Sequence, residues 1–234
     1  MARQGRVVFP GIPHHVTQRG NRRERIFFEP GDEQVYLDTL AVQLARFRVD
    51  CWSYCLMPNH VHLILVPEDD TGLARAVGET HRRYTTFIGV RSRWMGHLFQ
   101  GRFGSVAMDE DHLMAAFRYI ALNPVKAGLV GKAEDWQWSS TRAHLSGQDT
   151  PHVRVTPALS RIGDFSTYLK DVPETDERWA NILKAEFIGR PVGAKAWLEN
   201  LEAQSGRPLT PQKRGPKPKA DIKGKASSLP LFDI

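Results

Sequence analysis

Two histidines separated by one apolar residue, His60 and His62, are the side chains whose types and spacing most suggest a metal site. They open a run of β-branched and leucine residues, ending at Val66, that is typical of a β-strand. Alternate side chains of a strand point to the same face, so both imidazoles project together while Val61 faces the other way. Neighbouring imidazoles can share one metal ion. The alternative is a pair of buried or edge histidines that bind no ligand.

A tyrosine and an asparagine four residues apart, Tyr119 and Asn123, form a second candidate pair. Tyr119 lies off the apolar stripe of the helix predicted here, and Asn123 projects from the same flank one turn later. A tyrosine outside the core, followed by a carboxamide at the helix end, is an arrangement suited to chemistry. The alternative for Tyr119 is an aromatic at the edge of the core whose hydroxyl stays in water. The stripe itself consists of Leu113, Phe117, Ile120 and Ala121.

Hydrophobic periodicity and turn residues predict the elements that must position these side chains. Strands are expected at 13–19, 50–57 and 60–67, with another entered from the loop within 98–108. Helices are expected near 30–46, 72–88 and 110–122, the last ending before Pro124. This order predicts an α+β fold, with a split β-α-β pattern and an antiparallel sheet whose helices pack on one face.

The chain divides into three parts. Residues 1–150 are enough for one well-cored domain. Residues 151–205 form a helical extension, with helices expected at 164–170, 175–188 and 193–204, and the last two could form a helix-turn-helix. Residues 206–234 are a basic tail rich in proline, glycine and lysine, expected to be disordered until something anionic binds.

Basic residues are concentrated in three segments of a chain whose net charge is +6. Residues 206–225 carry seven basic side chains and one acidic one, while residues 1–25 and 75–103 each carry six arginines and one glutamate. This segregation favours a face that binds a polyanion, although a solvated charged surface is the alternative.

The expected location is the cytoplasm. No apolar run is long enough to span a bilayer, and the basic N-terminus lacks the apolar core of a signal peptide. The cysteines, Cys51 and Cys55, are expected to be reduced packing thiols.

Five segments, in order between residue 13 and about residue 145, together resemble the REP-associated tyrosine transposases of bacteria, a group of the single-tyrosine HUH transposases. The resemblance implies a ferredoxin-like or RRM-like HUH domain in residues 1–150, and carries little function onto the C-terminal third. The segments are His14-His-Val-Thr-Gln-Arg-Gly-Asn21, Tyr54-Cys-Leu-Met-Pro-Asn-His-Val-His62, Gly96-His-Leu-Phe-Gln-Gly-Arg-Phe-Gly104, Arg118-Tyr-Ile-Ala-Leu-Asn-Pro-Val-Lys-Ala-Gly-Leu-Val130 and Trp136-Gln-Trp-Ser-Ser140.

The resemblance implies a metal-dependent enzyme that cleaves and rejoins single-stranded DNA. Tyr119 would be the nucleophile, giving a 5′-phosphotyrosine and a free 3′-hydroxyl without ATP. His60, His62 and Asn123 would hold a divalent ion, Mg²⁺ or Mn²⁺ in the family. Ligand softness by itself favours Mn²⁺ over Mg²⁺, and zinc stays open.

The partner expected from the resemblance is hairpin DNA folded from a short palindromic repeat, and no membrane is expected. Arginines interleaved with aromatic residues suit phosphate neutralisation and base stacking. The expected DNA contacts are Arg19, Arg22, Arg23, Arg25, Arg82, Arg83, Arg91, Arg93, Arg102, Phe103, Lys213 and Arg214.

Two other functions stay open from the sequence. One is a DNA-binding protein that recognises hairpins but has lost cutting, and the other is a metal-dependent phosphoesterase that uses water in place of tyrosine. A monomer and a homodimer are both compatible with the sequence, and so is a tyrosine helix that acts in cis or in trans.

Overall fold

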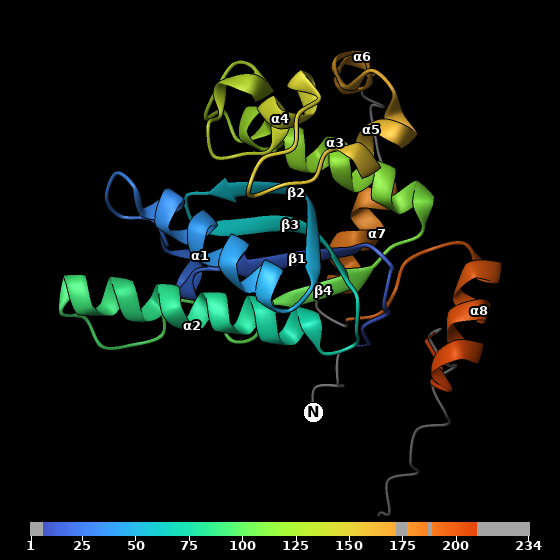
Figure 1. Cartoon of the computed structure of the whole chain (residues 1–234), viewed down its shortest axis with the longest axis horizontal. Helices are drawn as coiled ribbons and strands as arrows, with labels where there is room; N and C mark the ends of the chain where they lie inside the picture. Colours follow the sequence, from blue (N-terminus) through green and yellow to red (C-terminus); the bar gives the residue numbers. More distant parts are fainter. Residues whose placement is uncertain (1–6, 172–176, 187–188, 210–234) are drawn as a thin grey trace, which may run out of the picture.

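A four-stranded antiparallel sheet lies at the centre of the computed structural model, which describes residues 7–171, 177–186 and 189–209 (Figure 1). The register sets His60 opposite Arg19 and His62 opposite Thr17 on neighbouring strands. The α+β class and the predicted strands are confirmed. The strands, in the order β2-β3-β1-β4, are β1 (His14–Arg19), β2 (Val49–Met57), β3 (His60–Pro67) and β4 (Gly104–Ala107).

Helices cover both faces of the sheet, so the expectation of one covered face is wrong. Helices α1 (Asp32–Arg46) and α2 (Gly72–Ser92) share a core with Leu63 of β3. Helices α3 (Glu110–Lys126) and α7 (Glu177–Glu186) share a second core with Ile64, the next residue of the same strand. A strand that is apolar at successive positions must be buried on both sides.

Helix α3 continues through Pro124, where the sequence predicted that it would end. Pro124 lies in the last turn, where loss of one backbone donor disturbs little of the helix. The amide of Ala127 donates to the carbonyl of Asn123 at 2.9 Å, and that of Leu129 donates to Pro124 at 2.9 Å. Asn123 is therefore held within a regular turn of helix.

The segment after α3 closes the outer edge of β2. The amide of Leu56 donates to the carbonyl of Trp138, and the amide of Ser140 donates to the carbonyl of Tyr54. This pairing protects an edge strand that would otherwise expose its backbone groups. The remaining short elements here are η2 (Ala133–Asp135), α4 (Thr141–Ser146), α5 (Thr156–Ile162) and α6 (Phe165–Lys170).

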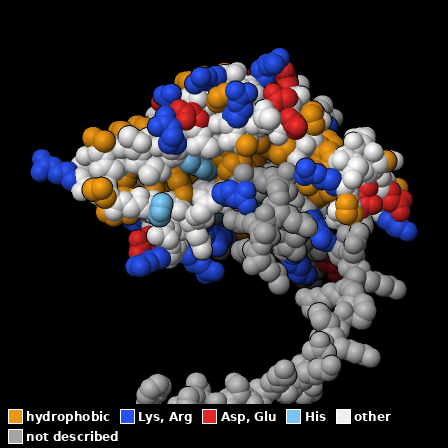
Figure 2. All heavy atoms as spheres, turned by 90° about the horizontal axis from the view of Figure 1, so that it is seen from below, with side chains coloured by type: hydrophobic (Ala, Val, Ile, Leu, Met, Phe, Trp, Pro, Cys, Tyr) orange, Lys and Arg blue, Asp and Glu red, His pale blue; other side chains and the backbone are white. Residues whose placement is uncertain are grey.

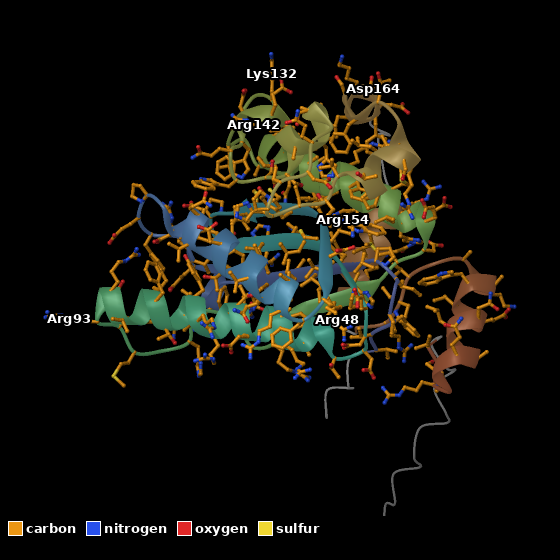
Figure 3. All side chains as sticks on the ribbon, in the orientation of Figure 1. Arg48, Arg93, Lys132, Arg142, Arg154 and Asp164 are labelled. Atoms are coloured by element: carbon orange, nitrogen blue, oxygen red, sulfur yellow. The ribbon has the colours of Figure 1, made fainter. Side chains whose placement is uncertain are left out.

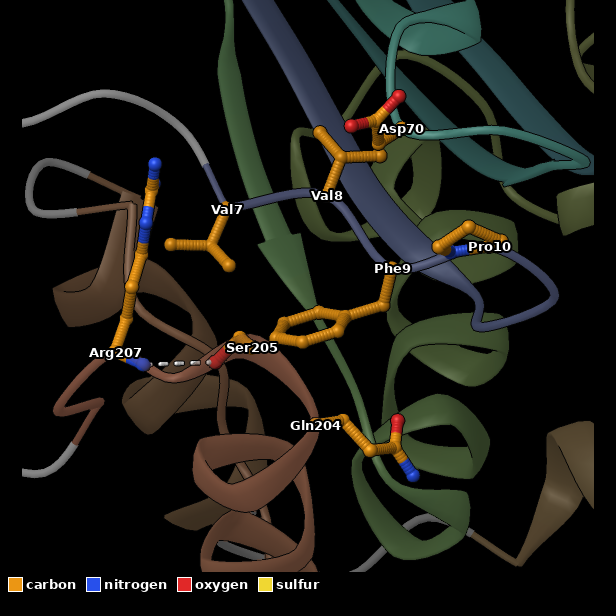
Figure 4. A pocket seen from close by; sticks show the side chains of 8 residues that line it. All are labelled: Val7, Val8, Phe9, Pro10, Asp70, Gln204, Ser205 and Arg207. Carbon is orange, nitrogen blue, oxygen red and sulfur yellow. Dashed lines mark hydrogen bonds between the residues drawn. The ribbon is translucent and has the colours of Figure 1, made fainter.

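The two helices that could form a helix-turn-helix pack on different neighbours. Helix α7 buries Trp179 and Ile182 beneath α3, whereas α8 (Lys195–Ser205) buries Leu201 against Phe9 of the N-terminal segment. This packing gives no support to a helix-turn-helix unit. A pocket of about 410 Å³ lies where the N-terminal segment meets the end of α8, and Figure 4 shows Phe9 pointing toward Ser205 there.

Both cysteines are buried free thiols, as expected. Within residues 7–171, 177–186 and 189–209, no helix is both long and apolar enough to cross a membrane. Residues 210–234, and with them Lys213 and Arg214, lie outside the described residues.

Candidate active site

His60 and His62 project from β3 toward the layer formed by α3 and α7, as the alternation of the strand predicts. Their ring centroids lie 4.8 Å apart and their planes are nearly perpendicular, at 84°. His62 is buried, whereas His60, at the first position of the strand, is partly exposed. The pair therefore combines one ring within the core with one at its rim.

Helix α3 brings Tyr119 to these histidines. The helix crosses the face of the sheet toward which Ile64 points. The ring centroid of Tyr119 lies 5.8 Å from that of His62, and the two ring planes meet at 78°. Tyr119 is partly exposed, and Lys126, two turns later, sets its ammonium 5.0 Å from the tyrosine ring centroid. The helix thus delivers an accessible hydroxyl-bearing ring beside the histidine pair.

Burial makes His62 a neutral group. It lowers the pKa of His62 well below the ordinary value, and the neighbouring His15, His60 and Arg19 lower that pKa further by positive charge. A neutral imidazole keeps a lone pair on one ring nitrogen, which is what a metal ligand requires.

A divalent cation at this site would need a carboxamide as its third ligand, and Asn123 lies one turn after Tyr119 on α3. In the part of the chain that the structure describes, no group of three His, Cys, Asp or Glu side chains is arranged to hold a metal. Asn123 is only 6% exposed, and its Nδ2 is buried with no hydrogen-bond partner among the described residues. A half-turn of the planar amide exchanges Nδ2 for Oδ1, so a cation could satisfy a group that the protein itself leaves unsatisfied.

His15, on the central strand β1, is a site residue that the sequence prediction did not single out. Its Nε2 lies 3.0 Å from Nδ1 of His62, and the two rings stack with centroids 5.2 Å apart. Both rings are buried. The only sequence signal is a polar residue within a strand that is buried on both faces, and the contact itself depends on strand register.

Trp179 of α7 is the second residue that the sequence analysis missed. Its ring stacks on Tyr119 with centroids 3.5 Å apart and planes at 16°, and it meets the His15 ring edge-on at 5.0 Å. The C-terminal extension therefore packs against the candidate site. Nothing in the sequence around Trp179 distinguishes it from an ordinary core tryptophan of an amphipathic helix.

The predicted arginines closest to the site come from β1 and the loop after it. Arg19 faces His60 across the β1–β3 ladder. The exposed Arg22, Arg23 and Arg25 follow, on a loop tied to the β2–β3 turn by a 2.8 Å bond from the amide of Gly20 to the carbonyl of Asn59. A Cβ at position 20 would lie 2.1 Å from the carbonyl oxygen of Glu24, so only glycine allows this loop to fold so tightly.

The predicted arginines of α2 differ in what they contact. Arg82 and Arg83 each bond Glu79 with exposed guanidinium groups. Arg91 forms a two-bonded ion pair with the buried carboxylate of Asp32, which ties α2 to the start of α1. Arg93 is exposed and points away from the tip of α2 (Figure 3).

Of the remaining predicted contacts, Arg102 is exposed and Phe103 is not. The Phe103 ring is buried in the core and lies edge-on to His81, with centroids 6.4 Å apart. Its contact with DNA stays a prediction, and in this structure the ring packs against protein.

A groove of about 550 Å³ lies on the side of the sheet that α2 covers, opposite the face of the histidine pair. It lies between α2 and residues 97–101, and its walls include Gln18, His81, Arg82 and Phe99. The Gln18 side chain donates to the carbonyl of Gly101 at 3.3 Å and joins the two sides. On the face shown in Figure 2, Lys and Arg side chains lie mostly around the outline of the molecule, and histidine lies among the uncharged side chains between them.

Comparison with known proteins points to one group. Residues 9–123 match the family model described as "Transposase IS200 like". A protein of Haemophilus influenzae described as a REP-associated tyrosine transposase is 27% identical over 110 residues, which cover 42% of this chain and 62% of that protein. An Escherichia coli K12 protein of the same description is 26% identical over 95 residues, covering 40% of this chain and 54% of its own length. The match thus spans somewhat more than half of each curated relative.

Among solved structures, one is described as a REP-associated tyrosine transposase bound to a REP hairpin. It superposes with a TM-score of 0.55 at 22% identity, covering 66% of this chain and 92% of that chain. At this level of identity the match shows a shared fold.

Proposed function

The chain belongs to the IS200-like transposase family, where its similarities lie with the REP-associated tyrosine transposases, and we propose that it cleaves and rejoins single-stranded hairpin DNA through Tyr119. The observation that carries the proposal is the contact of Tyr119 on α3 with His62 on β3, 57 residues apart in sequence, with ring centroids 5.8 Å apart. The His60 ring lies 4.8 Å from that of His62, so the nucleophile and the histidine pair share one face of the sheet.

The reaction is a transesterification. The Tyr119 hydroxyl oxygen attacks the phosphorus of a phosphodiester, and the bond from phosphorus to the 3′ oxygen breaks. The proton lost by the tyrosine balances the proton gained by the 3′ oxygen, so the products are a 5′-phosphotyrosine and a 3′-hydroxyl. The ester remains activated, and attack by another 3′-hydroxyl rejoins the strands without ATP.

His60, His62 and Asn123 would hold a divalent cation, Mg²⁺ or Mn²⁺, that polarises the phosphate and offsets its charge. All three ligands are uncharged, so the charge of the cation would remain available to the DNA. Arg19, opposite His60, would meet the same phosphate. The exposed arginines of the loop after β1 and the groove beside α2 supply a path for the strand, with Phe99 in its wall.

The decisive experiment is covalent trapping on a denaturing gel. Hairpin oligonucleotides from the genomic flanks, labelled at the 5′ or 3′ end, are incubated with Mn²⁺ or EDTA. We expect a metal-dependent adduct that retains the 3′ label and is absent in Tyr119→Phe. Tyr168→Phe is the matched control, because Tyr168 is also partly exposed but lies on α6, and it should form the adduct.

The other outcomes separate the competing functions. Cleavage that forms no adduct and persists in Tyr119→Phe would establish a phosphoesterase that uses water. Hairpin binding with neither cleavage nor adduct would establish a DNA-binding protein that does not cut.

A further inference from the structure

We propose that His15 and Asn59 are positioning residues for the two strand histidines. His15 bonds Nδ1 of His62 and Asn59 bonds Nδ1 of His60, so that Nε2 of both rings faces one divalent cation. The inference rests on the proposed function and adds an outer shell to its metal site. Neither residue is a candidate ligand itself, and each bonds one of the two strand histidines.

The bond from His60 to Asn59 settles which nitrogen of His60 carries the proton. Nδ1 of His60 lies 2.6 Å from Oδ1 of Asn59. The other end of the same amide, Nδ2, donates to the carbonyl of Arg23 at 2.9 Å, which fixes the orientation of the carboxamide. Since Oδ1 can only accept, Nδ1 of His60 is the donor, and in a neutral ring Nε2 then keeps the lone pair.

The bond between His62 and His15 can set the tautomer of the buried ring in the same way. Nδ1 of His62 lies 3.0 Å from Nε2 of His15, so one of the two nitrogens donates and the other accepts. If His62 donates, its Nε2 becomes a ligand of the same kind as Nε2 of His60. Metal-bound histidines usually donate their second ring nitrogen to such an outer partner, which sets both the tautomer and the ring orientation.

His15 is well placed to hold its own orientation. It lies on the central strand β1 and is buried, with the His62 ring stacked against it and Trp179 edge-on at 5.0 Å. A ring confined in this way cannot swing aside when a cation arrives. The bonded His62 ring therefore keeps the orientation that the ion needs.

Neither outer partner carries a negative charge, which has a chemical consequence. The common partner of a metal-bound histidine is a carboxylate, which adds negative charge near the ion. An imidazole and a carboxamide orient the ligands without adding negative charge. The site would bind its cation less tightly but leave more positive charge for a phosphate.

The test measures Mn²⁺ binding by the loss of the free-ion electron paramagnetic resonance signal, without DNA. We expect His15→Leu to weaken Mn²⁺ affinity by roughly 10- to 100-fold and His15→Gln, which keeps a hydrogen-bonding group, to recover most of that loss. Asn59→Ala should weaken affinity and Asn59→Asp, which retains the acceptor oxygen, should not. His14→Leu is the matched control, because His14 is equally buried on the same strand but bonds the backbone of Ile12, so Mn²⁺ affinity should stay unchanged.

Long-range ¹H–¹⁵N spectra of the imidazoles add a readout that a merely structural role would not move. We expect both His60 and His62 to be protonated at Nδ1 in the wild type, and His62 to lose that preference in His15→Leu. A His62 ring protonated at Nε2 in the wild type would overturn the inference.

The binding data also separate this inference from the proposed function. If the wild type and His62→Ala bind Mn²⁺ equally, the metal site itself is wrong. If His62→Ala loses binding while His15→Leu retains it fully, only the positioning role is overturned. Loss in His15→Gln as complete as in His62→Ala would make His15 a ligand and would also overturn it.

Discussion

At the scale of single residues, the site combines side chains that the sequence singles out with side chains that it does not. His60, His62, Tyr119 and Asn123 could be named from spacing, because the periods of strand and helix put them on common faces. His15 and Trp179 could not, because their contacts with His62 and Tyr119 cross between elements far apart in sequence. Local periodicity carries no information about such pairs.

Arg19 should be the arginine whose loss most affects DNA, because it faces His60 across the strand pair. Arg19→Ala should weaken binding of single-stranded hairpin DNA by roughly tenfold, about 1.4 kcal/mol. It should also reduce the slope of log affinity against log salt by about 1. Fluorescence anisotropy over a salt series measures both.

The matched control for Arg19 is Arg142→Ala. Arg142 is exposed on α4, above the sheet in the view of Figure 3, and its Nε donates to the carbonyl of Glu134. Equal effects of the two substitutions would show that binding follows general charge alone and would contradict a specific role for Arg19.

Arg91 should behave as a structural residue. Arg91 forms an ion pair with Asp32, whose side chain is only 1% exposed. Burial by itself would raise the pKa of Asp32, but the bonds from Arg91 and from the amides of Glu29 and Phe28 lower that pKa overall. Arg91→Ala leaves the carboxylate buried without its cation and should lower the unfolding free energy by roughly 3 kcal/mol.

Urea unfolding tests this, with Arg93→Ala as the control. Arg93 is exposed at the end of α2, and its loss should change the unfolding free energy by less than about 0.5 kcal/mol. A stable Arg91→Ala variant with weakened DNA binding would instead place Arg91 at the DNA.

At the scale of elements, the candidate site is formed by helix α7 as well as by the predicted sheet and helix α3. The sequence predicted a helix over 175–188, but not that it would lie beneath α3 and stack Trp179 on Tyr119. Amphipathic periodicity shows that a helix has a buried face, and only the tertiary structure decides which surface covers it.

Trp179→Ala should therefore destabilise the extension and uncover Tyr119. Truncation of a buried tryptophan costs about 3–5 kcal/mol of unfolding free energy, and Trp179→Phe, which keeps a stacked ring, should cost less. Urea unfolding measures the first effect. Nitration by tetranitromethane with peptide mapping measures the second, and Tyr119 should react faster in the alanine variant. Unchanged stability and unchanged nitration would show that α7 does not hold this position.

At the scale of the whole molecule, buried histidines make stability depend on pH. Burial lowers the pKa of His14 to about 4 against an opposing bond with the backbone of Ile12, and burial also lowers the pKa of His144. The unfolded chain takes up protons near pH 6.5, and the folded chain does not. Stability is therefore full above about pH 6.5 and should fall toward pH 4, by up to about 1.4 kcal/mol per pH unit for each group.

Urea unfolding at pH 7.5, 6 and 5 tests the sign and the slope. His14→Leu should be less stable than the wild type at pH 7.5 but should show a shallower fall with pH, because it lacks one of the buried histidines whose pKa is lowered. Equal unfolding free energies of the wild type at pH 7.5 and pH 5 would contradict the prediction.

The sequence by itself determined the strands, the main helices, the α+β class and the residues of the candidate site that share one element. These features depend on interactions between neighbours along the chain and on the period of each element. The tertiary structure decided which faces are covered, that α3 runs through Pro124, that Arg91 pairs with Asp32, and that His15 and Trp179 close on the site. Those outcomes depend on how complementary surfaces pack across long sequence separations, and no local pattern encodes such packing.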